Sequence, residues 1–308
     1  MSPLHYHAGQ LAVQAEANSR DLADRMAQWV GPAGEFAERA DMLVFAMPES
    51  DGHLRFAVIS GPAPLATATG TSGIRIHAAR PPHFSDGPVG GLAINLGEAR
   101  RVRLNGTLRL DADGALLTVQ EAFTLCRKYL APSRGLGPGV YAGPASMEEL
   151  TPNDPWIISV LEAAETTFLG SISPDGAPDV AHRGGPAGFL SFDPTTRMLA
   201  WPEYLGDGVF KSAGNVRATA ELALLIPDLA SGDAIVLRGR GRYTNERVLR
   251  QERRDPLVQH REAFPVQGRI ACEVRDAWRL RGLMHPREQA QHLASINSRS
   301  STHEQAPQ

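Results

Sequence analysis

The chain repeats its own turn residues at a constant spacing. Asp51-Gly52 recurs as Asp175-Gly176, and Gly61-Pro62-Ala63 recurs as Gly185-Pro186-Ala187, both at an offset of 124 positions. These residue types favour tight turns, because Gly accepts a positive φ and Pro and Asp suit the neighbouring positions. Turn residues shared at one offset are typical of a duplicated supersecondary unit. The repeat therefore predicts two similar domains in tandem.

Strand-like segments between those turns repeat as well. Three segments of the first copy recur in the second: 74–77 as 198–201, 92–94 as 222–224, and 104–106 as 237–239. The last two pairs have somewhat larger offsets, which indicates an insertion in the second copy. Many short strands separated by frequent turns are typical of β-barrels. The sequence therefore predicts a mainly β chain of two all-β barrels with peripheral helices.

Hydrophobic periodicity and turn residues place the expected elements. Strands are predicted at 42–48, 53–60, 73–78, 91–96, 101–111, 115–119, 166–173, 177–183, 188–193, 197–201, 221–227, 233–244 and 268–281. Helices are predicted at 8–30, 121–130 and 155–164, with a short one between 208 and 218. The expected domains are 1–132, a linker rich in Pro and Gly at 133–150, a second domain at 151–285, and a disordered polar tail at 286–308.

Composition narrows the class of protein. A hydrophobic fraction of 42% and a charged fraction of 21% are typical of a globular chain. The net charge of −3 disfavours nucleic acid and anionic membranes as partners. No apolar run approaches the roughly 20 residues needed to cross a bilayer. Cys126 and Cys272 form neither a disulfide framework nor a metal motif, so we expect a cytoplasmic protein without a metal.

The two copies differ in where they carry polar residues. The second has His182-Arg183-Gly184 where the first has Val58-Ile59-Ser60. It also has 22 residues from Trp201 to Leu222, where the first copy has 16 from His77 to Leu92. The longer segment contains Lys211, Ser212 and Asn215. We therefore expect the chemistry to lie in the second half of the chain.

The segment 206–215 has the features of an anion site. It resembles a Walker A loop, but Phe210 stands before Lys211 where that loop requires Gly, and no βαβ pattern surrounds it. We therefore reject a nucleoside triphosphatase. A glycine-rich turn leading into a helix still exposes free backbone N–H groups, beside the Ser212 hydroxyl and the Lys211 ammonium group. An ordinary surface loop with a helix cap is the alternative interpretation.

Other polar residues leave more than one interpretation open. Arg183 suits a phosphate or a flavin carbonyl, or a salt bridge at a strand end. Arg238, Arg240 and Arg242 alternate along one predicted strand and suit an anionic ligand, a partner subunit or RNA, of which RNA is disfavoured by the acidic net charge. His182 could titrate, donate to a ring, or cap a strand.

Several segments resemble the pyridoxamine 5′-phosphate oxidase-like flavin-binding proteins. The strongest similarity lies in 168–189, with its HRGGPxGF string, and in 199–215, with its KSxGN string. The segments 6–14 and 119–129 resemble the degenerate leading domain of a two-barrel branch of that family. The resemblance implies tandem split β-barrels, a homodimer, and FMN in the groove between barrels.

The resemblance also implies a set of site residues. By motif match, Arg183, Lys211 and Ser212 would grip the FMN phosphate, while His182, Trp201 and Pro202 would lie near the flavin ring or the ribityl chain. Gly184 and Asn215 complete the implied cofactor site. The chain departs from the family at Asp207, where an acid stands close to the expected phosphate.

These observations lead to one expected function and two alternatives. We expect an FMN-dependent oxidoreductase in which the first barrel is structural and the second binds the flavin, with a small-molecule substrate and an electron donor as partners. His182 is the expected catalytic residue, because the first copy lacks it. The alternatives are a protein that holds flavin or haem without turnover, and one that uses the deazaflavin F420, whose acidic tail would suit the Arg238–Arg242 stripe.

Overall fold

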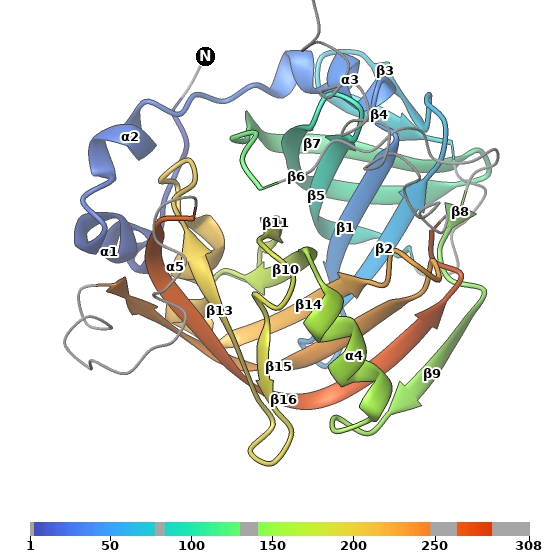
Figure 1. Cartoon of the computed structure of the whole chain (residues 1–308). Coiled ribbons are helices and arrows are strands. Elements are labelled where there is room, and N and C mark those ends of the chain that lie inside the picture. Colours follow the sequence, from blue (N-terminus) through green and yellow to red (C-terminus); the bar gives the residue numbers. More distant parts are fainter. Residues whose placement is uncertain (1–2, 78–83, 130–140, 247–263, 285–308) are drawn as a thin grey trace, which may run out of the picture.

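The computed structural model describes residues 3–77, 84–129, 141–246 and 264–284. The predicted tail at 286–308 and residues 133–140 of the predicted linker lie outside these ranges. Two antiparallel sheets account for about half of the described residues, one sheet from each copy (Figure 1). The prediction of a mainly β chain with two barrel-like units and peripheral helices is therefore confirmed.

The first sheet contains eight strands. In spatial order they are β3 (Ala66–Thr69), β4 (Gly73–Ile76), β7 (Gly114–Thr124), β6 (Arg100–Asp111), β5 (Gly87–Asn95), β1 (Met42–Pro48), β2 (Leu54–Ser60) and β8 (Tyr141–Ala142). The second sheet runs β11 (Pro178–Gly184), β10 (Thr166–Ile172), β14 (Glu221–Pro227), β15 (Ala234–Asn245), β16 (Val266–Arg281), β13 (Met198–Tyr204) and β12 (Ser191–Asp193), and β9 (Ser146–Leu150) pairs with β16.

The predicted duplication is visible in the strand order. The first sheet reads β2-β1-β5-β6-β7-β4-β3 and the second reads β11-β10-β14-β15-β16-β13-β12, which is the same order strand for strand. The register shifts beside Gly106 in one copy and beside Gly239 in the other. A Cβ at either glycine would lie 2.1 Å from a carbonyl oxygen of the neighbouring strand, so both bulges require Gly.

Five helices lie at the periphery of the described residues. They are α1 (Ala8–Glu16), α2 (Arg20–Asp24), α3 (Val30–Glu38), α4 (Pro155–Ala163) and α5 (Lys211–Thr219). The helices α3 and α4 precede β1 and β10 respectively, which again follows the repeat. The short helix expected between 208 and 218 is confirmed as α5, and the first copy has no equivalent among its described residues. None of the helices in these ranges is long and apolar enough to span a bilayer.

Two predicted helices were wrong. The helix expected at 8–30 is divided, because Asn18 has a φ of 53° and turns the chain between α1 and α2. Pro32 lies in the first turn of α3, where a missing N–H has no consequence. In place of the helix expected at 121–130, residues 121–124 form the end of β7 and 125–129 form neither helix nor strand, since pairing of Phe123 with Arg103 on β6 overrides the local helical pattern.

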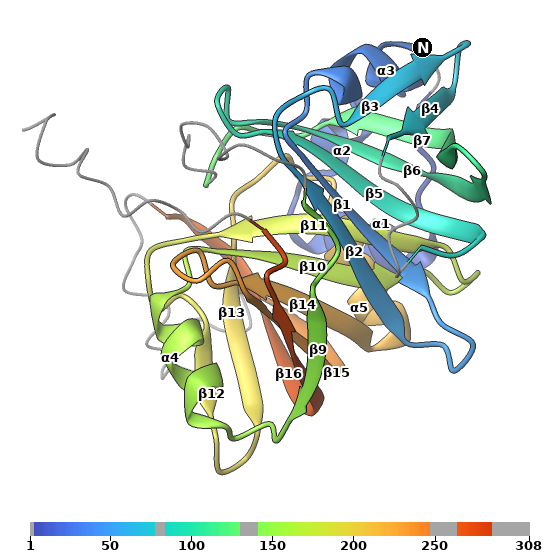
Figure 2. The same cartoon turned by 90° about the vertical axis from the view of Figure 1, so that its right-hand side faces the viewer.

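Each barrel has its own apolar core, and a third cluster joins the barrels. This interbarrel cluster includes Val44 and Val58 of the first copy and Val180 and Val236 of the second. Figure 2 shows β1, β2 and β5 running alongside β10 and β11. The approach is close, because a Cβ on Gly90 would lie 2.6 Å from the Cα of Asp179. The two copies therefore pack on one another within a single chain.

The amino-terminal segment crosses from the first copy to the second. Although α3 covers the first barrel, α1 packs against α5 of the second (Figure 1). Side chains of this segment reach the loop before α5, where Gln14 Nε2 donates to Val209 O at 2.8 Å and Ser19 Oγ donates to Gly208 O at 2.9 Å. The start of the chain thus holds the loop and helix that the sequence marked as an anion site.

Candidate functional site

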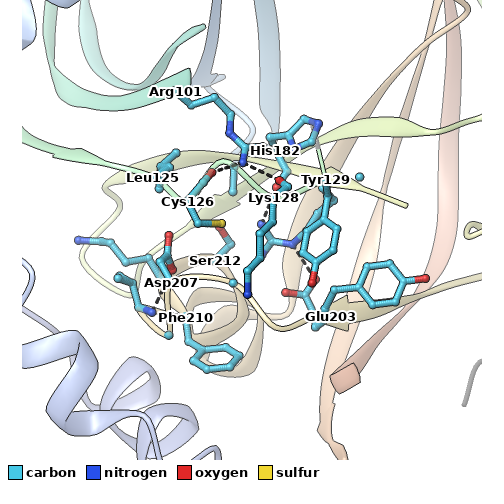
Figure 3. A pocket seen from close by; sticks show the side chains of 18 of the residues that line it. Arg101, Leu125, Cys126, Lys128, Tyr129, His182, Glu203, Asp207, Phe210 and Ser212 are labelled. Carbon is cyan, nitrogen blue, oxygen red and sulfur yellow. Dashed lines mark hydrogen bonds and ion pairs between the residues drawn. The ribbon is translucent and has the colours of Figure 1, made fainter. Parts of the chain in front are cut away.

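A cavity of about 100 Å³ opens between the two barrels, and both copies line it. The second copy contributes the end of β11, part of β13 and the turn that leads into α5. The first copy contributes β6 and the chain that follows β7. Figure 3 shows the labelled side chains converging from these elements. The described chain therefore builds both walls of the cavity by itself.

Six of the eight residues predicted to hold a cofactor line this cavity. They are His182, Arg183, Gly184, Pro202, Lys211 and Ser212. Trp201 is fully buried in the core of the second barrel instead. Asn215 is buried beside α1, where its Oδ1 accepts from Gln10 Nε2 at 3.0 Å. The motif residues thus meet at one place, with Trp201 and Asn215 supporting it from behind.

Arg183 is held in an ion pair at the cavity wall. Its Nε donates to Glu203 Oε1 at 2.8 Å, and the same oxygen accepts from Trp201 Nε1 at 3.0 Å. Burial alone would lower the pKa of Arg183, but the Glu203 carboxylate raises it above its ordinary value. Arg183 is therefore a fixed cation whose charge is largely balanced by Glu203.

Lys211 begins α5 and is also paired. Its Nζ lies 2.6 Å and 2.8 Å from the two carboxylate oxygens of Glu121, a residue of the first copy. No side chain caps the first N–H groups of α5, and Phe210 before them has a left-handed φ of 52°. The uncapped N–H groups, the Lys211 ammonium group and the Ser212 hydroxyl are called the α5 cradle below. Together they have the chemistry of an anion site.

A buried network connects the α5 cradle to the first barrel. Ser212 Oγ donates to Asp179 Oδ2 at 2.9 Å, and Asn105 Nδ2 donates to Asp179 Oδ1 at 3.1 Å. Arg103 of the first copy forms an ion pair with the same carboxylate. Burial would raise the pKa of Asp179, but Arg103, with Lys211 and Asn105, outweighs burial and keeps this pKa below its ordinary value. Asp179 is therefore an anion that fastens the two barrels together.

His182 has both ring nitrogens engaged. Its Nδ1 contacts the Arg101 guanidinium, and its Nε2 lies 2.6 Å from Thr166 Oγ1. Because arginine is always a donor, Nδ1 accepts and the Nε2–H donates to Thr166. Burial, followed by the charges of Arg101 and Arg183, holds the pKa of His182 well below 6.5. His182 is accordingly a neutral side chain near pH 7.

The first copy supplies a wall that our sequence interpretation treated as structural only. Its lining residues are Arg101, Arg103, Phe123, Leu125, Cys126, Lys128 and Tyr129. Counting from the matching bulges, Arg101 and Arg103 occupy the positions of Ala234 and Val236 in the second copy. A polar residue opposite an apolar one is the same signal that singled out His182. Comparing the copies in both directions would have found these arginines.

The internal repeat relates the cavity to a second position on the interface between the barrels, and apolar side chains fill that second position. Val58 stands where the second copy has His182, and Ala234 and Val236 stand where the first copy has arginines. All three belong to the interbarrel cluster and are at most 6% exposed. The duplicated fold therefore offers two related positions, of which only one is polar and open.

The cationic stripe of β15 is already partly neutralised. Arg238 pairs with Glu49 at 2.6 Å and lies over the Trp278 ring, with 4.5 Å between the guanidinium carbon and the ring centre. Arg240 pairs with Glu221 at 2.5 Å. Two of the three arginines in the predicted stripe thus have carboxylate partners within the chain. The stripe offers less free charge to an acidic cofactor tail than its sequence indicated.

Comparisons with known proteins give only distant similarity. No protein-family model and no curated protein matches the sequence. Among solved structures, a protein related to general stress protein 26 (pyridoxinephosphate oxidase family) from Clostridium acetobutylicum has 10% identity and a TM-score of 0.30, covering 42% of this chain and 87% of its own. An FAD-binding protein from Mesorhizobium loti has 14% identity and a TM-score of 0.30, with coverages of 43% and 96%. A protein titled F420 reductase has 18% identity and a TM-score of 0.27, with coverages of 39% and 93%.

Proposed function

We propose that this chain is a flavin-dependent oxidoreductase that holds FMN in the cavity between its two barrels. The observation that carries the proposal is the gathering of cations around one cavity. They are Arg101, Arg103, Lys128, Arg183 and Lys211, drawn from both copies. Such a set suits the phosphate of a cofactor, which carries about two negative charges. The support comes from the site itself, because the distant structural similarity identifies neither a ligand nor an activity.

The α5 cradle fits a phosphate group. Free N–H groups at a helix start favour an anion, and Lys211 and Ser212 add a cation and a hydroxyl at the same place. Asp207, the acid expected to disturb this site, accepts a hydrogen bond from Val209 N at 3.1 Å and so caps its own loop. The residues present are therefore suited to a phosphate monoester.

The flavin ring requires more room than the cavity now encloses. Cofactor pockets typically measure roughly 300–1,000 Å³, whereas this cavity measures about 100 Å³. Lys128 is exposed, and its one side-chain hydrogen bond in the described residues, from Nζ to Leu205 O, is long at 3.4 Å. Tyr129 is held more firmly, by the rings of Tyr204 and Phe264 and by a hydrogen bond from its hydroxyl to Leu205 O at 3.0 Å. We expect ring binding to displace Lys128 first, and Tyr129 only with loss of its ring contacts, while the α5 cradle stays in place.

Bound FMN would supply hydride or electron transfer between a small-molecule substrate and an electron donor. His182 remains our candidate for a residue that influences a half-reaction. Since both of its nitrogens are engaged, its influence would pass through the position of Arg101. We expect His182→Ala to slow reduction or reoxidation of the flavin while changing FMN affinity by only a few-fold.

A flavin holder without turnover is the second candidate. The hydrogen bonding of His182 favours it, because both ring nitrogens are engaged and burial holds the pKa of this side chain well below 6.5. The visible spectrum of the purified full-length protein, with the mass of the released ligand, tests the proposal first. Release of haem, or no chromophore after incubation with FMN, would reject it. A flavin that nicotinamide donors and other cellular donors leave oxidised would favour the holder.

The proposed site does not depend on a second chain. Both walls come from one copy of the sequence, so a homodimer is not needed to complete the cavity. Our expectation of a homodimer, drawn from the resemblance, remains a prediction that light scattering on the purified protein would test. The expected cytoplasmic location likewise remains a prediction from the unpaired cysteines.

A further inference from the structure

Arg101 differs from the other buried cations of the cavity wall. In the described residues, Arg103 pairs with Asp179, Arg183 with Glu203 and Lys211 with Glu121. Arg101 is 5% exposed and has no carboxylate within ion-pair distance among these residues. Burial lowers the pKa of Arg101, and the Asp207 carboxylate of the same wall opposes this only from beyond ion-pair distance. No ion pair therefore balances the charge of Arg101.

The hydrogen bonds of Arg101 also leave donors unused. An arginine side chain has five N–H donors. Its bonds in this structure go to the His182 ring and to the backbone oxygens of Cys126 and Lys128, which leaves two donors. The buried Nε is one of those without a partner. A buried cation with unpaired donors is unfavourable unless a ligand completes its shell.

Arg101 and the α5 cradle both line the cavity, but the hydrogen bonds of Arg101 go to His182, Cys126 and Lys128 and not to the cradle. Figure 3 shows Arg101 and His182 together at one side of the view, Phe210 and Asp207 at the other, and Ser212 of the cradle between them. His182 is fixed by Thr166, so the Arg101 guanidinium is held in position by a rigid acceptor. A phosphate at the cradle would therefore leave the Arg101 end available to another anionic group.

We propose that Arg101 forms an oxyanion subsite, separate from the α5 cradle, that binds the carboxylate or phosphate group of a small-molecule substrate. The first barrel thereby takes part in substrate selection in addition to its structural role. This inference rests on the proposed function only for the identity of the flavin beside the subsite. Anionic substrates would bind in preference to neutral analogues of the same shape, because only an anion both accepts hydrogen bonds from Arg101 and balances its charge.

Calorimetric titration of the full-length, FMN-loaded protein with inorganic phosphate tests the subsite. Acetate serves as a carboxylate probe, and chloride at equal ionic strength as a control for screening. We expect phosphate to bind without changing the affinity for FMN, and Arg101→Met to weaken phosphate and acetate binding by roughly ten- to a hundredfold. Arg238→Met, which removes a paired arginine outside the cavity, is the matched control and should have no effect.

Two further variants keep the test decisive. Lys128 is exposed at the mouth of the cavity, and Lys128→Met should weaken phosphate binding by only a few-fold. If Arg101→Met does not fold, Arg101→Lys retains a cation and should still weaken binding several-fold, because the guanidinium fork is lost. Equal effects of the Lys128 and Arg101 variants would indicate that the positive charge of the cavity attracts phosphate without a specific contact, and would overturn the subsite.

The remaining outcomes separate the subsite from the cofactor proposal. Phosphate that competes with FMN would place the cofactor phosphate at Arg101 and overturn a separate subsite. If the protein binds no flavin, the cofactor proposal fails, but the titration is still informative on the flavin-free protein. There, loss of phosphate binding in Arg101→Met would support the subsite, and unchanged binding would overturn it.

Discussion

The ion pair between Lys211 and Glu121 makes the role of Lys211 testable in detail. The two side chains are 11% and 17% exposed, and the lysine Nζ lies 2.6 Å from the nearer carboxylate oxygen. In Lys211→Met the phosphate of FMN would lose a charge-assisted hydrogen bond, worth about 1.5–3 kcal/mol. FMN affinity should therefore fall by roughly ten- to a hundredfold. The same variant leaves the Glu121 carboxylate unpaired beside the phosphate, so the observed loss should lie toward the upper end.

The double variant Lys211→Met/Glu121→Gln separates these two contributions. Glu121→Gln removes the anion that has lost its ion-pair partner, so the double variant should recover part of the lost FMN affinity but not all of it. Riboflavin has no phosphate and should lose much less affinity in either variant. Quenching of flavin fluorescence during titration of the full-length protein gives all the dissociation constants, and unfolding in urea confirms that each variant is folded.

Two results would refute the assignment. Equal losses for FMN and riboflavin would mean that Lys211 supports the fold or the ring rather than the phosphate. Full recovery of FMN affinity in the double variant would mean that Lys211 only neutralises Glu121. In the second case the α5 cradle would hold phosphate through backbone N–H groups and Ser212 alone.

Three further predictions follow from the interface between the barrels. Because the related position is filled by the interbarrel cluster, fluorescence titration should find one FMN per chain; two tight sites would contradict this. Gly90→Ala should destabilise the fold by about 1–3 kcal/mol in urea unfolding, since its Cβ would meet the Asp179 backbone, and unchanged stability would mean that the barrels separate easily. The pKa of His182 is lowered in the folded state, so its contribution to stability is present above pH 6.5 and is lost as pH falls. Below pH 6.5, the free energy of unfolding of the parent protein should fall relative to that of His182→Gln by up to about 1.4 kcal/mol per pH unit. The same dependence on pH in both proteins would refute the assignment.

Much of the fold could be predicted because its signals are local. The Asp-Gly turns have positive φ at Gly52 and Gly176, as hairpin turns of this kind require. The matched glycines at 106 and 239 mark equivalent bulges, since a side chain at either would collide with the next strand. Local pattern failed where strand pairing or a single left-handed residue decided, as at Phe123 and Asn18.

The candidate site could be predicted only in part, for a related reason. Lys211 and Ser212 lie together on one turn and one helix start, so their chemistry is readable from adjacent positions. Adjacent positions do not mark Arg101, and in the sequence only its comparison with Ala234 of the second copy does so. The position of its guanidinium in the cavity depends on contact with His182, which lies 81 positions away in the sequence.

By itself the sequence determined the repeated Asp-Gly turns and the glycine-rich start of α5. Each of these depends on backbone conformations that a few adjacent residues set. Tertiary structure alone decided that the first barrel lines the cavity, that carboxylates neutralise Arg183 and Lys211, and that Arg101 has none. Those properties arise from charges brought together across the interface, where the low dielectric strengthens each charge–charge attraction and makes a buried cation without an ion pair unfavourable until a ligand binds it.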